Sequence, residues 1–391
     1  MARRRSSRTR SRSRSRTSRS RSGWPSRRSG RSRGGGSGSL LLLAALIFGG
    51  GYAYLHAKGD LTTGHGATHG SSAHASTPAA SAAPAGGGTT AAGGTAFVFA
   101  TGGTSEPTIY KFIESAHSSL NMTMYELSDT TAVDDLVARK KAGVNVRIVL
   151  DQAEKTTNQS AFDTLQSAGI GVVWSATAYQ YTHQKTITVD DRETLILTGN
   201  LTTKYYAETR DYGDFDTDAN DVKAVVAVFD ADYAHKSVAP GDADDLLWSP
   251  TTSRARVLSV IAGARRTLDV EGEEFSDSSV VNAVVARAKA GVAVRVLVES
   301  PSQYAGEIKK VVAAGGKVAG YSSSTGLYIH AKAVIADAGL SDRTVEFGSM
   351  NYTSTSLGRN RELGLVLHDA ADVSLVEKQF AADFTGGAQQ S

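Results

Sequence analysis

Two copies of one short pattern, each with a histidine, a lysine and an aspartate at fixed spacing, are the residues best suited to chemistry. They are His183, Lys185 and Asp190 in the first copy and His330, Lys332 and Asp337 in the second. A neutral imidazole can attack phosphorus, and a protonated imidazole can donate its proton to a leaving oxygen. A pair of such motifs therefore predicts cleavage of a phosphodiester bond.

Each motif is followed by a short segment with a hydroxyl and an amide side chain, and then by an acidic residue. These are Thr198, Asn200 and Asp211 in the first copy and Ser349, Asn351 and Glu362 in the second. Ammonium, amide and hydroxyl groups can donate to the charged oxygens of a phosphoryl transition state. Asp211 and Glu362 are candidates for the carboxylates that fix the tautomer and orientation of the imidazoles. The two imidazoles must titrate as a pair, one neutral and one charged.

Other interpretations of these residues are weaker. One His-x-Lys pair alone is typical of a surface strand, whereas two complete copies at equivalent places in a repeat form a specific signal. A charged lysine is a poor metal ligand, and each copy has few histidines and carboxylates. We therefore expect neither a metal nor another cofactor.

The two motifs belong to a longer internal repeat. Residues 142–150 read AGVNVRIVL, and residues 290–298 read AGVAVRVLV. The offset is 148 here, 147 between the histidines and 151 between the asparagines, and it grows across 338–342, which indicates a longer turn. Duplication followed by small insertions leaves such a pattern. We predict two similar halves, residues 96–240 and 241–391, whose paired sites meet at the interface between them.

Hydrophobic periodicity predicts that helices alternate with buried strands. In the first half we expect strands at 120–127, 144–150 and 171–174 and helices at 130–142 and 161–168. Each His-x-Lys pair is expected within a strand, at 181–189 and 327–335, because side chains two apart on a strand share a face. The predicted fold class is α/β, with two similar α/β/α sandwich halves, mixed sheets, a pseudo-two-fold axis and the active site at the interface.

Polar and aromatic residues follow two of the expected strands, and their role is open. They are Met124, Tyr125 and Glu126 in the first half and Glu273 and Glu274 in the second. They either line the mouth of a pocket or are strand ends held by local bonds, and we favour the second interpretation.

Charge divides the chain into a basic tail and an acidic domain. Residues 1–58 carry 15 of the 42 lysines and arginines, and one acidic residue precedes position 96. The remaining 27 basic and 38 acidic residues give residues 96–391 a net charge of −11. The chain has no cysteine, which excludes disulfides and thiolate metal sites.

Three segments precede the predicted halves. Residues 1–33 are nearly all arginine and serine and are expected to be disordered, and residues 58–95 have the composition of a flexible linker. Between them, residues 34–57 are uncharged and apolar. We expect this segment to be a transmembrane anchor with the catalytic domain outside the cytoplasm, the alternative being a cleaved signal peptide of a secreted protein.

At the two motifs the sequence resembles the phospholipase D superfamily, whose signature is a His-Lys-Asp motif followed by Gly-Ser-x-Asn. The resemblance extends to residues 360–364 and looks closest to bacterial members related to cardiolipin synthases and secreted phospholipases D. It implies a histidine nucleophile, assigned to His183, a general acid, assigned to His330, and no required metal. It also implies that Asp190 and Asp337 support the motif through local bonds.

The first half departs from the family pattern at one place. Leu197 and Thr198 stand where the family has Gly-Ser. The threonine hydroxyl can replace that of serine, and the leucine is expected to tighten the approach of the backbone to a phosphate.

Lipids and nucleic acids both contain phosphodiesters. An acidic domain repels a DNA backbone, and placement outside a membrane suits lipid head groups. We therefore expect a monomeric catalytic unit that hydrolyses phospholipids or transfers their head groups, bound to the membrane through its N-terminal segment. A metal-independent endonuclease and a catalytically weak, membrane-tethered binding protein are the alternatives.

Overall fold

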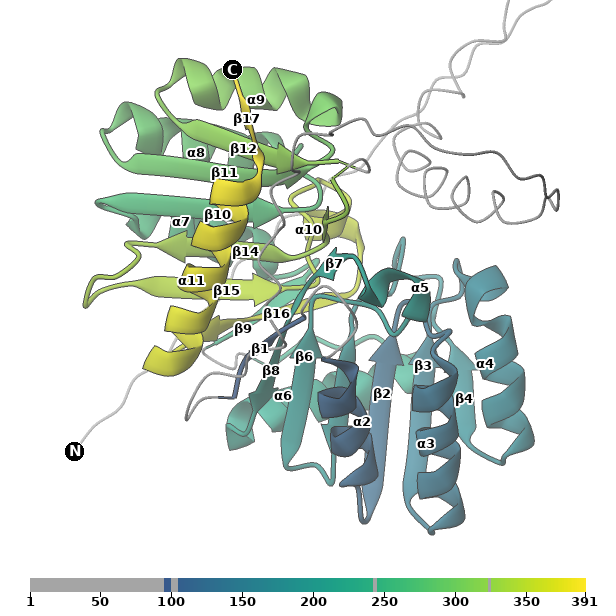
Figure 1. The fold of residues 1–391 in the computed structure, drawn as a ribbon. Coiled ribbons are helices and arrows are strands. Elements are labelled where there is room, and N and C mark those ends of the chain that lie inside the picture. The colour runs from purple at the N-terminus through teal and green to yellow at the C-terminus, as the bar shows by residue number, and fades with distance from the viewer. Residues whose placement is uncertain (1–94, 100–104, 242–244, 323–324) are drawn as a thin grey trace, which may run out of the picture. The chain divides into compact units, whose positions relative to one another are not determined.

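Strands rich in branched residues form two mixed sheets, one in each half of the repeat (Figure 1). The computed structural model describes residues 95–99, 105–241, 245–322 and 325–391. The expectations for the basic tail, the apolar segment and all but the last residue of the linker lie outside these ranges. Within them, no helix combines the length and the apolar character needed to span a membrane.

The first sheet has the strand order β1-β8-β6-β5-β2-β3-β4. Its strands are β1 (Phe97–Val98), β2 (Ser119–Met124), β3 (Asn145–Leu150), β4 (Gly171–Trp174), β5 (Thr186–Val189), β6 (Glu193–Leu197) and β8 (Tyr212–Asp216). Strands β2, β3 and β4 run parallel, and the other neighbours are antiparallel. Parallel strands covered on both faces read as near-continuous apolar runs, as residues 148–150 of β3 do.

The second sheet repeats this arrangement and adds one strand at its edge, in the order β17-β12-β11-β10-β14-β15-β16-β9. Its strands are β9 (Leu246–Ser249), β10 (Thr267–Gly272), β11 (Ala293–Glu299), β12 (Lys317–Tyr321), β14 (Lys332–Ala336), β15 (Thr344–Gly348), β16 (Glu362–Leu367) and β17 (Ala388–Gln390). The turn between β14 and β15 covers 337–343, against 190–192 between β5 and β6, which accounts for the growth in the repeat offset.

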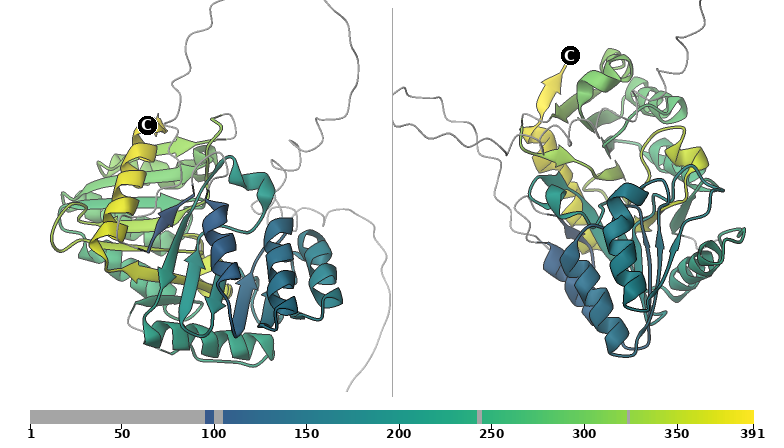
Figure 2. Two further views of the ribbon diagram at one scale, coloured as in Figure 1. Left: turned by 60° about the horizontal axis from the view of Figure 1, so that its bottom comes forward. Right: turned by 90° about the vertical axis from the view of Figure 1, so that its right-hand side faces the viewer.

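Helices pack on both faces of each sheet, which gives each half its three layers (Figure 2). They are α2 (Glu106–Glu114), α3 (Thr130–Lys141), α4 (Lys155–Ser167), α5 (Thr203–Tyr206) and α6 (Ala219–Tyr233), then α7 (Ser253–Gly263), α8 (Ser278–Lys289), α9 (Ala305–Ala313), α10 (Ser356–Arg359) and α11 (Ala370–Gly386), with a 3₁₀ turn at Pro301–Tyr304. Asp129 and Asp277 begin the equivalent helices α3 and α8, where each carboxylate accepts two backbone N–H groups. The predicted fold class is confirmed.

Most elements expected from the sequence form close to their predicted bounds, and three differ. Helix α4 begins at Lys155, earlier than 161, because residues 155–160 are polar and carry no periodic apolar signal. The strand expected over 181–189 is reduced to β5, and the one expected over 327–335 is divided between β13 (Tyr328–Ile329) and β14. The residues before each histidine leave their own sheet and pair with the opposite half.

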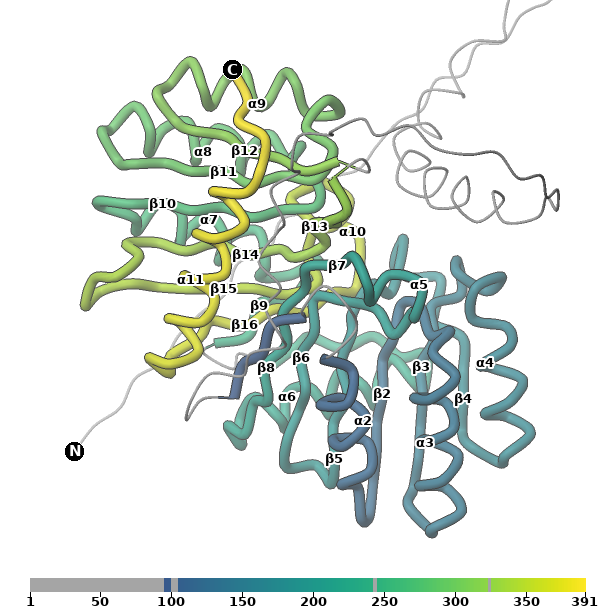
Figure 3. The backbone as a smooth tube through the Cα atoms, in the orientation of Figure 1, coloured from purple at the N-terminus to yellow at the C-terminus, as the bar shows by residue number. Residues whose placement is uncertain are grey.

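These exchanged pairs join the two halves, as the tube in Figure 3 shows for β7 (Thr209–Arg210) beside β13. In the equivalent place of the pseudo-two-fold, Thr182 bridges Arg361 in parallel. One hydrophobic cluster also contains residues of both halves, with Tyr212 of β8 and Phe347 of β15 at a centroid distance of 5.8 Å. Shared strand pairing and a shared core make the interface part of the fold.

Candidate active site

His183 lies just before β5, in a segment whose backbone pairs with the opposite half. Its N–H donates to the Arg361 carbonyl at 2.9 Å, and its Nδ1 lies 2.9 Å from Oε2 of Glu362 at the start of β16. The Nδ1 is therefore committed to a carboxylate of the second half. Nε2 is the nitrogen left for chemistry.

His330 repeats this geometry with the halves exchanged. Its N–H donates to the Arg210 carbonyl at 3.2 Å, and its Nδ1 lies 2.8 Å from Oδ1 of Asp211, which immediately precedes β8. The two carboxylates predicted to orient the imidazoles both do so, and each one acts on the histidine of the other half. The sequence identified the partners but did not reveal that they are crossed.

Other side chains hold each of these two carboxylates in place. Oδ2 of Asp211 accepts from Thr209 Oγ1 at 2.7 Å, and its Oδ1 accepts from Thr198 Oγ1 at 2.6 Å. Oε1 of Glu362 accepts from Asn360 Nδ2 at 2.8 Å and from Ser356 Oγ at 2.5 Å. Thr209, Asn360 and Ser356 carried no motif signal of their own, although Asn360 begins a segment that resembled the family.

Charge and burial set the protonation of this group. Burial alone would raise the pKa of Asp211 and Glu362, but the neighbouring imidazoles and lysines lower both below the ordinary carboxyl value, so both are ionised. Burial, together with the charge of Lys185, lowers the pKa of His183 to about 4, against the opposing pull of Glu362. His183 is therefore a neutral imidazole near pH 7.

The two motif lysines are almost fully buried. Lys185 Nζ donates to the carbonyl oxygen of His183 at 2.7 Å, and Lys332 Nζ donates to that of His330. Burial and the charge of Lys332 lower the pKa of Lys185 to about 7. A buried ammonium group needs a negative charge beside it, and a phosphate is an anion of suitable charge.

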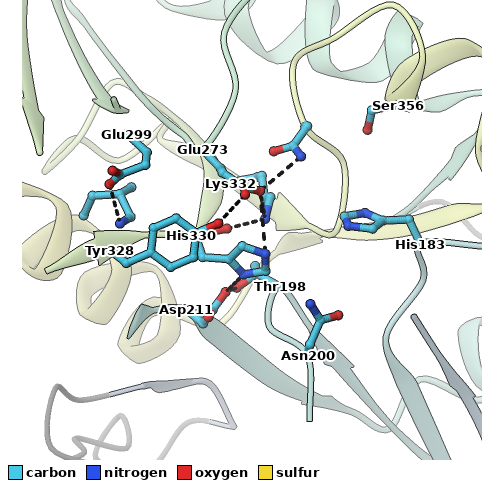
Figure 4. Close-up of polar contacts among 12 residues, drawn as sticks. His183, Thr198, Asn200, Asp211, Glu273, Glu299, Tyr328, His330, Lys332 and Ser356 are labelled. Carbon is cyan, nitrogen blue, oxygen red and sulfur yellow. Dashed lines mark hydrogen bonds and ion pairs between the residues drawn. The ribbon is translucent and has the colours of Figure 1, made fainter. Parts of the chain in front are cut away.

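Glu273, directly after β10, belongs to the site, although we interpreted it from the sequence as a locally bonded strand end. Its Oε2 lies 3.0 Å from Lys332 Nζ, 3.1 Å from Asn351 Nδ2 and 3.6 Å from His330 Nε2 (Figure 4). Tyr328 donates its hydroxyl hydrogen to Oε1. A strand-end glutamate has no sequence pattern that distinguishes it from a solvated one, so this contact could not be predicted.

The equivalent place in the first half holds an aromatic ring. Tyr125 follows β2 as Glu273 follows β10, and its ring centroid lies 4.5 Å from that of His183 and 5.1 Å from Lys185 Nζ. Next to it, Glu126 Oε2 accepts from Asn200 Nδ2 at 3.5 Å. The predicted asparagines therefore both reach the site, and each contacts a carboxylate.

The hydroxyls of Thr198 and Ser349 bond to the protein, whereas we had expected them to donate to phosphate. Thr198 Oγ1 accepts from the Tyr212 N–H at 2.8 Å, and Ser349 Oγ accepts from the Leu363 N–H at 3.2 Å. These bonds fix the backbone next to Asp211 and Glu362.

Leu197 is buried, and a Cβ added to Gly213 would lie 2.8 Å from its Cδ2, so the leucine packs over that glycine.

Asp190 and Asp337 follow the far ends of β5 and β14, away from the histidines that precede those strands. Asp190 accepts hydrogen bonds from the backbone N–H groups of residues 117–119, and the shortest of these bonds is 2.7 Å. Asp337 accepts hydrogen bonds from the backbone N–H groups of residues 265–267, and the shortest of these is 2.6 Å. Both aspartates have positive φ, 54° and 59°. The structure therefore does not bring them together with the other motif residues.

Within the described ranges, no group of three or more histidine, aspartate and glutamate side chains is arranged to hold a metal ion. The site is built from imidazoles, ammonium groups, amides and carboxylates. Chemistry by proton transfer, nucleophilic attack and charge stabilisation requires no other components.

The site and fold define a member of the phospholipase D superfamily of phosphodiesterases and transferases. The chain belongs to the family described as cardiolipin synthase, phospholipase D-like domain, whose model matches residues 109–233 and 257–384, once in each half. A comparison with curated proteins gave no match.

Two solved structures share the fold. One is polyphosphate kinase from Porphyromonas gingivalis, with a TM-score of 0.58 and 14% identity, covering 73% of this chain and 50% of that chain. The other is phosphatidylserine synthase from Haemophilus influenzae Rd KW20, with a TM-score of 0.57 and 12% identity, covering 76% of this chain and 87% of that chain. At these identities the likeness is one of fold, and the chain spans about half the length of the kinase.

Proposed function

We propose that the protein is a phosphodiesterase of the phospholipase D type that acts on phospholipids through a covalent phosphohistidine. The observation that carries this proposal is the crossed pair of contacts, His183 to Glu362 and His330 to Asp211. Each contact fixes Nδ1 and leaves Nε2 of an imidazole for the substrate. Two such imidazoles beside two buried lysines form a complete set for phosphoryl transfer.

In the first step, Nε2 of His183 attacks phosphorus and the bond from phosphorus to the leaving alcohol oxygen breaks. His330, protonated, donates its proton to that oxygen, and the alcohol leaves. His330 then takes a proton from water or from an acceptor alcohol, whose oxygen attacks phosphorus and releases His183. Water gives hydrolysis, and an alcohol gives head-group transfer.

The assignment of roles to the two histidines is supported by their different surroundings. The lowered pKa of His183 keeps its imidazole neutral, as a nucleophile must be. Carboxylate oxygens lie beside both ring nitrogens of His330, Asp211 at 2.8 Å from Nδ1 and Glu273 at 3.6 Å from Nε2, and we propose this imidazole as the general acid. The amine and amide groups proposed to bind the non-bridging oxygens are those of Lys185, Lys332, Asn200 and Asn351.

Phospholipid is the proposed substrate class because the described domain is acidic and because relatives of this fold are named for phospholipid synthesis. The net charge of residues 96–391 opposes the approach of DNA. The matching family is described by cardiolipin synthase, and one similar structure is a phosphatidylserine synthase. We further propose that residues 34–57 hold the domain at the outer face of the cell membrane, the alternative being secretion.

The test compares phospholipid vesicles with plasmid DNA as substrates, using the wild-type chain in the presence of a chelator. We expect release of head group from vesicles and no cleavage of DNA. His183→Ala and His330→Ala should each lower turnover by about 10³-fold or more. Wild type denatured at neutral to alkaline pH, where a phosphohistidine is stable, should carry label from phosphate-labelled lipid on His183. DNA cleavage without lipid turnover would instead identify a nuclease, and binding without a phosphoenzyme would identify a binding protein.

A further inference from the structure

The carboxylate of Glu273 occupies the set of donors that a substrate phosphate needs in the second half. One oxygen, Oε2, lies within 3.1 Å of both Lys332 Nζ and Asn351 Nδ2 and 3.6 Å from His330 Nε2. Under the proposed function, these ammonium, amide and imidazole groups bind and protonate the oxygens of the phosphodiester. The glutamate oxygen therefore holds the place of a phosphate oxygen (Figure 4).

The first half has no such anion at the equivalent position. Tyr125 stands there, with its ring against His183 and Lys185. Because a phenol is neutral, Lys185 has no equivalent counter-charge at this place, whereas Lys332 has one. The two motifs are thus alike in their histidines and lysines but not in this neighbour.

Binding of a phosphodiester creates a charge problem at Glu273. Burial would raise the pKa of this carboxyl, but Lys332, His330 and Tyr328 hold it well below the ordinary value, so the group is ionised. A phosphate that takes Lys332 and Asn351 removes two partners of the carboxylate and brings a second negative charge beside it. At a separation of a few ångströms in a partly buried site, this repulsion is large.

The surroundings of Glu273 offer a way to relieve this repulsion. Its side chain is 20% exposed, against 1% for Lys332, so it can turn toward solvent without opening the core. Tyr328, which donates to it, lies beside Tyr205 at a centroid distance of 6.2 Å, and the Tyr205 ring already has an ammonium group over it, Lys204 Nζ at 4.7 Å from the centroid. A carboxylate next to aromatic faces is a chemical environment that binds ammonium groups.

We propose that Glu273 is a specificity-determining residue. Its carboxylate leaves Lys332 and Asn351 when the phosphate binds to them, and an ammonium group on the substrate's alcohol then neutralises its charge. The inference rests on the proposed function for the phosphodiester and adds the class of head group, one with a cationic amine. Phosphodiesters whose head groups carry no cation leave the displaced carboxylate without a partner and are selected against.

The first test uses inorganic phosphate and choline as separate probes, with binding to the full chain measured by calorimetry. For the wild type, choline should tighten phosphate binding several-fold, because it takes the displaced carboxylate. Glu273→Gln should bind phosphate on the order of ten-fold more tightly than the wild type and should not respond to choline. Unchanged or weaker phosphate binding by this variant would overturn the proposal, as would a wild type in which choline has no effect.

Glu299→Gln is the matched control. This buried glutamate accepts from the N–H of Ile329, the residue before His330, at 3.1 Å and from Ser300 Oγ at 3.1 Å, and it makes neither a hydrogen bond nor an ion pair with Lys332 or Asn351. It should retain the wild-type affinity for phosphate and its response to choline. The response of the wild type alone still decides the matter if Glu273→Gln fails to fold.

The second test compares vesicles of phosphatidylcholine with vesicles of phosphatidylglycerol that have the same acyl chains. The wild type should prefer phosphatidylcholine by about ten-fold or more in kcat/KM, and Glu273→Gln should lose several-fold of that preference. An unchanged ratio in the variant would contradict the inference. Absence of turnover with any lipid would contradict the proposed function alone, because the coupling between phosphate and choline is measured without a lipid.

Discussion

Nδ1 of His183 lies 2.9 Å from Oε2 of Glu362, a carboxylate that the opposite half of the protein contributes. The exchange of backbone pairing explains the contact, since the N–H of His183 donates to the carbonyl of Arg361 next to it. His330 and Asp211 repeat the relationship in the other direction. Neither half alone therefore contains an oriented imidazole.

Replacing either carboxylate by its amide should disable the histidine of the other half. Glu362→Gln and Asp211→Asn keep the size of each side chain but remove the charge that fixes the imidazole tautomer. We expect kcat to fall by about 10²–10⁴-fold in each variant with little change in KM, as measured by steady-state release of head group.

Double substitutions test whether the pairs are crossed. Glu362→Gln should add little to His183→Ala, and Asp211→Asn should add little to His330→Ala, because each pair acts as a unit. Full additivity within either pair would contradict the crossed arrangement.

Side chains with a repeated pattern could be predicted, and those defined only by tertiary contacts could not. The spacing of Asp211 and Glu362 after the asparagines identified both acids, and the branched residues of β3 and β11 identified two strands of the sheets. The exchange of pairing before His183 could not be foreseen, because a short segment reads the same whether it pairs within its own sheet or across an interface. Glu273 breaks the repeat, so the comparison of halves that found the other residues could not find it.

Activity should depend on pH through Lys185 and His183, with kcat/KM highest between about pH 4 and about pH 7. The nucleophile must be neutral, and the pKa of His183 is lowered to about 4, so activity falls as pH drops through that value. Lys185 must be protonated to bind the phosphate oxygens. Its pKa is lowered to about 7, so activity falls as pH rises through that value. A profile of kcat/KM against pH measures both limbs.

Lys185→Arg is the variant that assigns the alkaline limb. A guanidinium stays charged throughout this range, so the alkaline limb should move to higher pH while the acid limb stays near pH 4. An alkaline limb that does not move would exclude Lys185 as its origin.

The motif aspartates should affect stability and leave the chemistry intact. Asp190→Asn keeps a residue type that tolerates positive φ but weakens the bonds to the backbone N–H groups of residues 117–119. We expect a loss of about 1–2 kcal/mol in the free energy of unfolding, measured by urea titration at pH 7, and kcat within two-fold of the wild type.

The stabilising effect of Asp190 should depend on pH in a definite direction. Burial alone would raise the pKa of Asp190, but hydrogen bonds from backbone N–H groups lower this pKa from 3.8 to about 2 in the folded protein. Its stabilising contribution is present above pH 3.8 and is lost as pH falls through about 2. The difference between Asp190→Asn and the wild type should therefore shrink over that range. A large loss of kcat in folded Asp190→Asn would place this residue in the chemistry instead.

Two crossed ion pairs should hold the halves in the register that the site needs. Arg361 lies 2.9 Å from Asp232 of α6, and Arg210 lies 2.6 Å from Asp383 of α11, so each arginine reaches into the other half. All four side chains are largely buried. Arg361→Met leaves Asp232 buried without its cation, and we expect a loss of about 3–5 kcal/mol in the free energy of unfolding. Because Arg361 precedes Glu362, kcat should fall as well.

Urea titration and a double-mutant cycle measure this coupling. The double variant Arg361→Met, Asp232→Asn should recover part of the stability, because no unpaired charge remains in the interface. Arg265→Ala serves as the surface control, since Arg265 pairs with Asp342 at 3.5 Å with both side chains mostly exposed, and it should change stability by less than about 0.5 kcal/mol. Equal losses in Arg361→Met and Arg265→Ala would mean that the buried pairs are not what holds the two halves together.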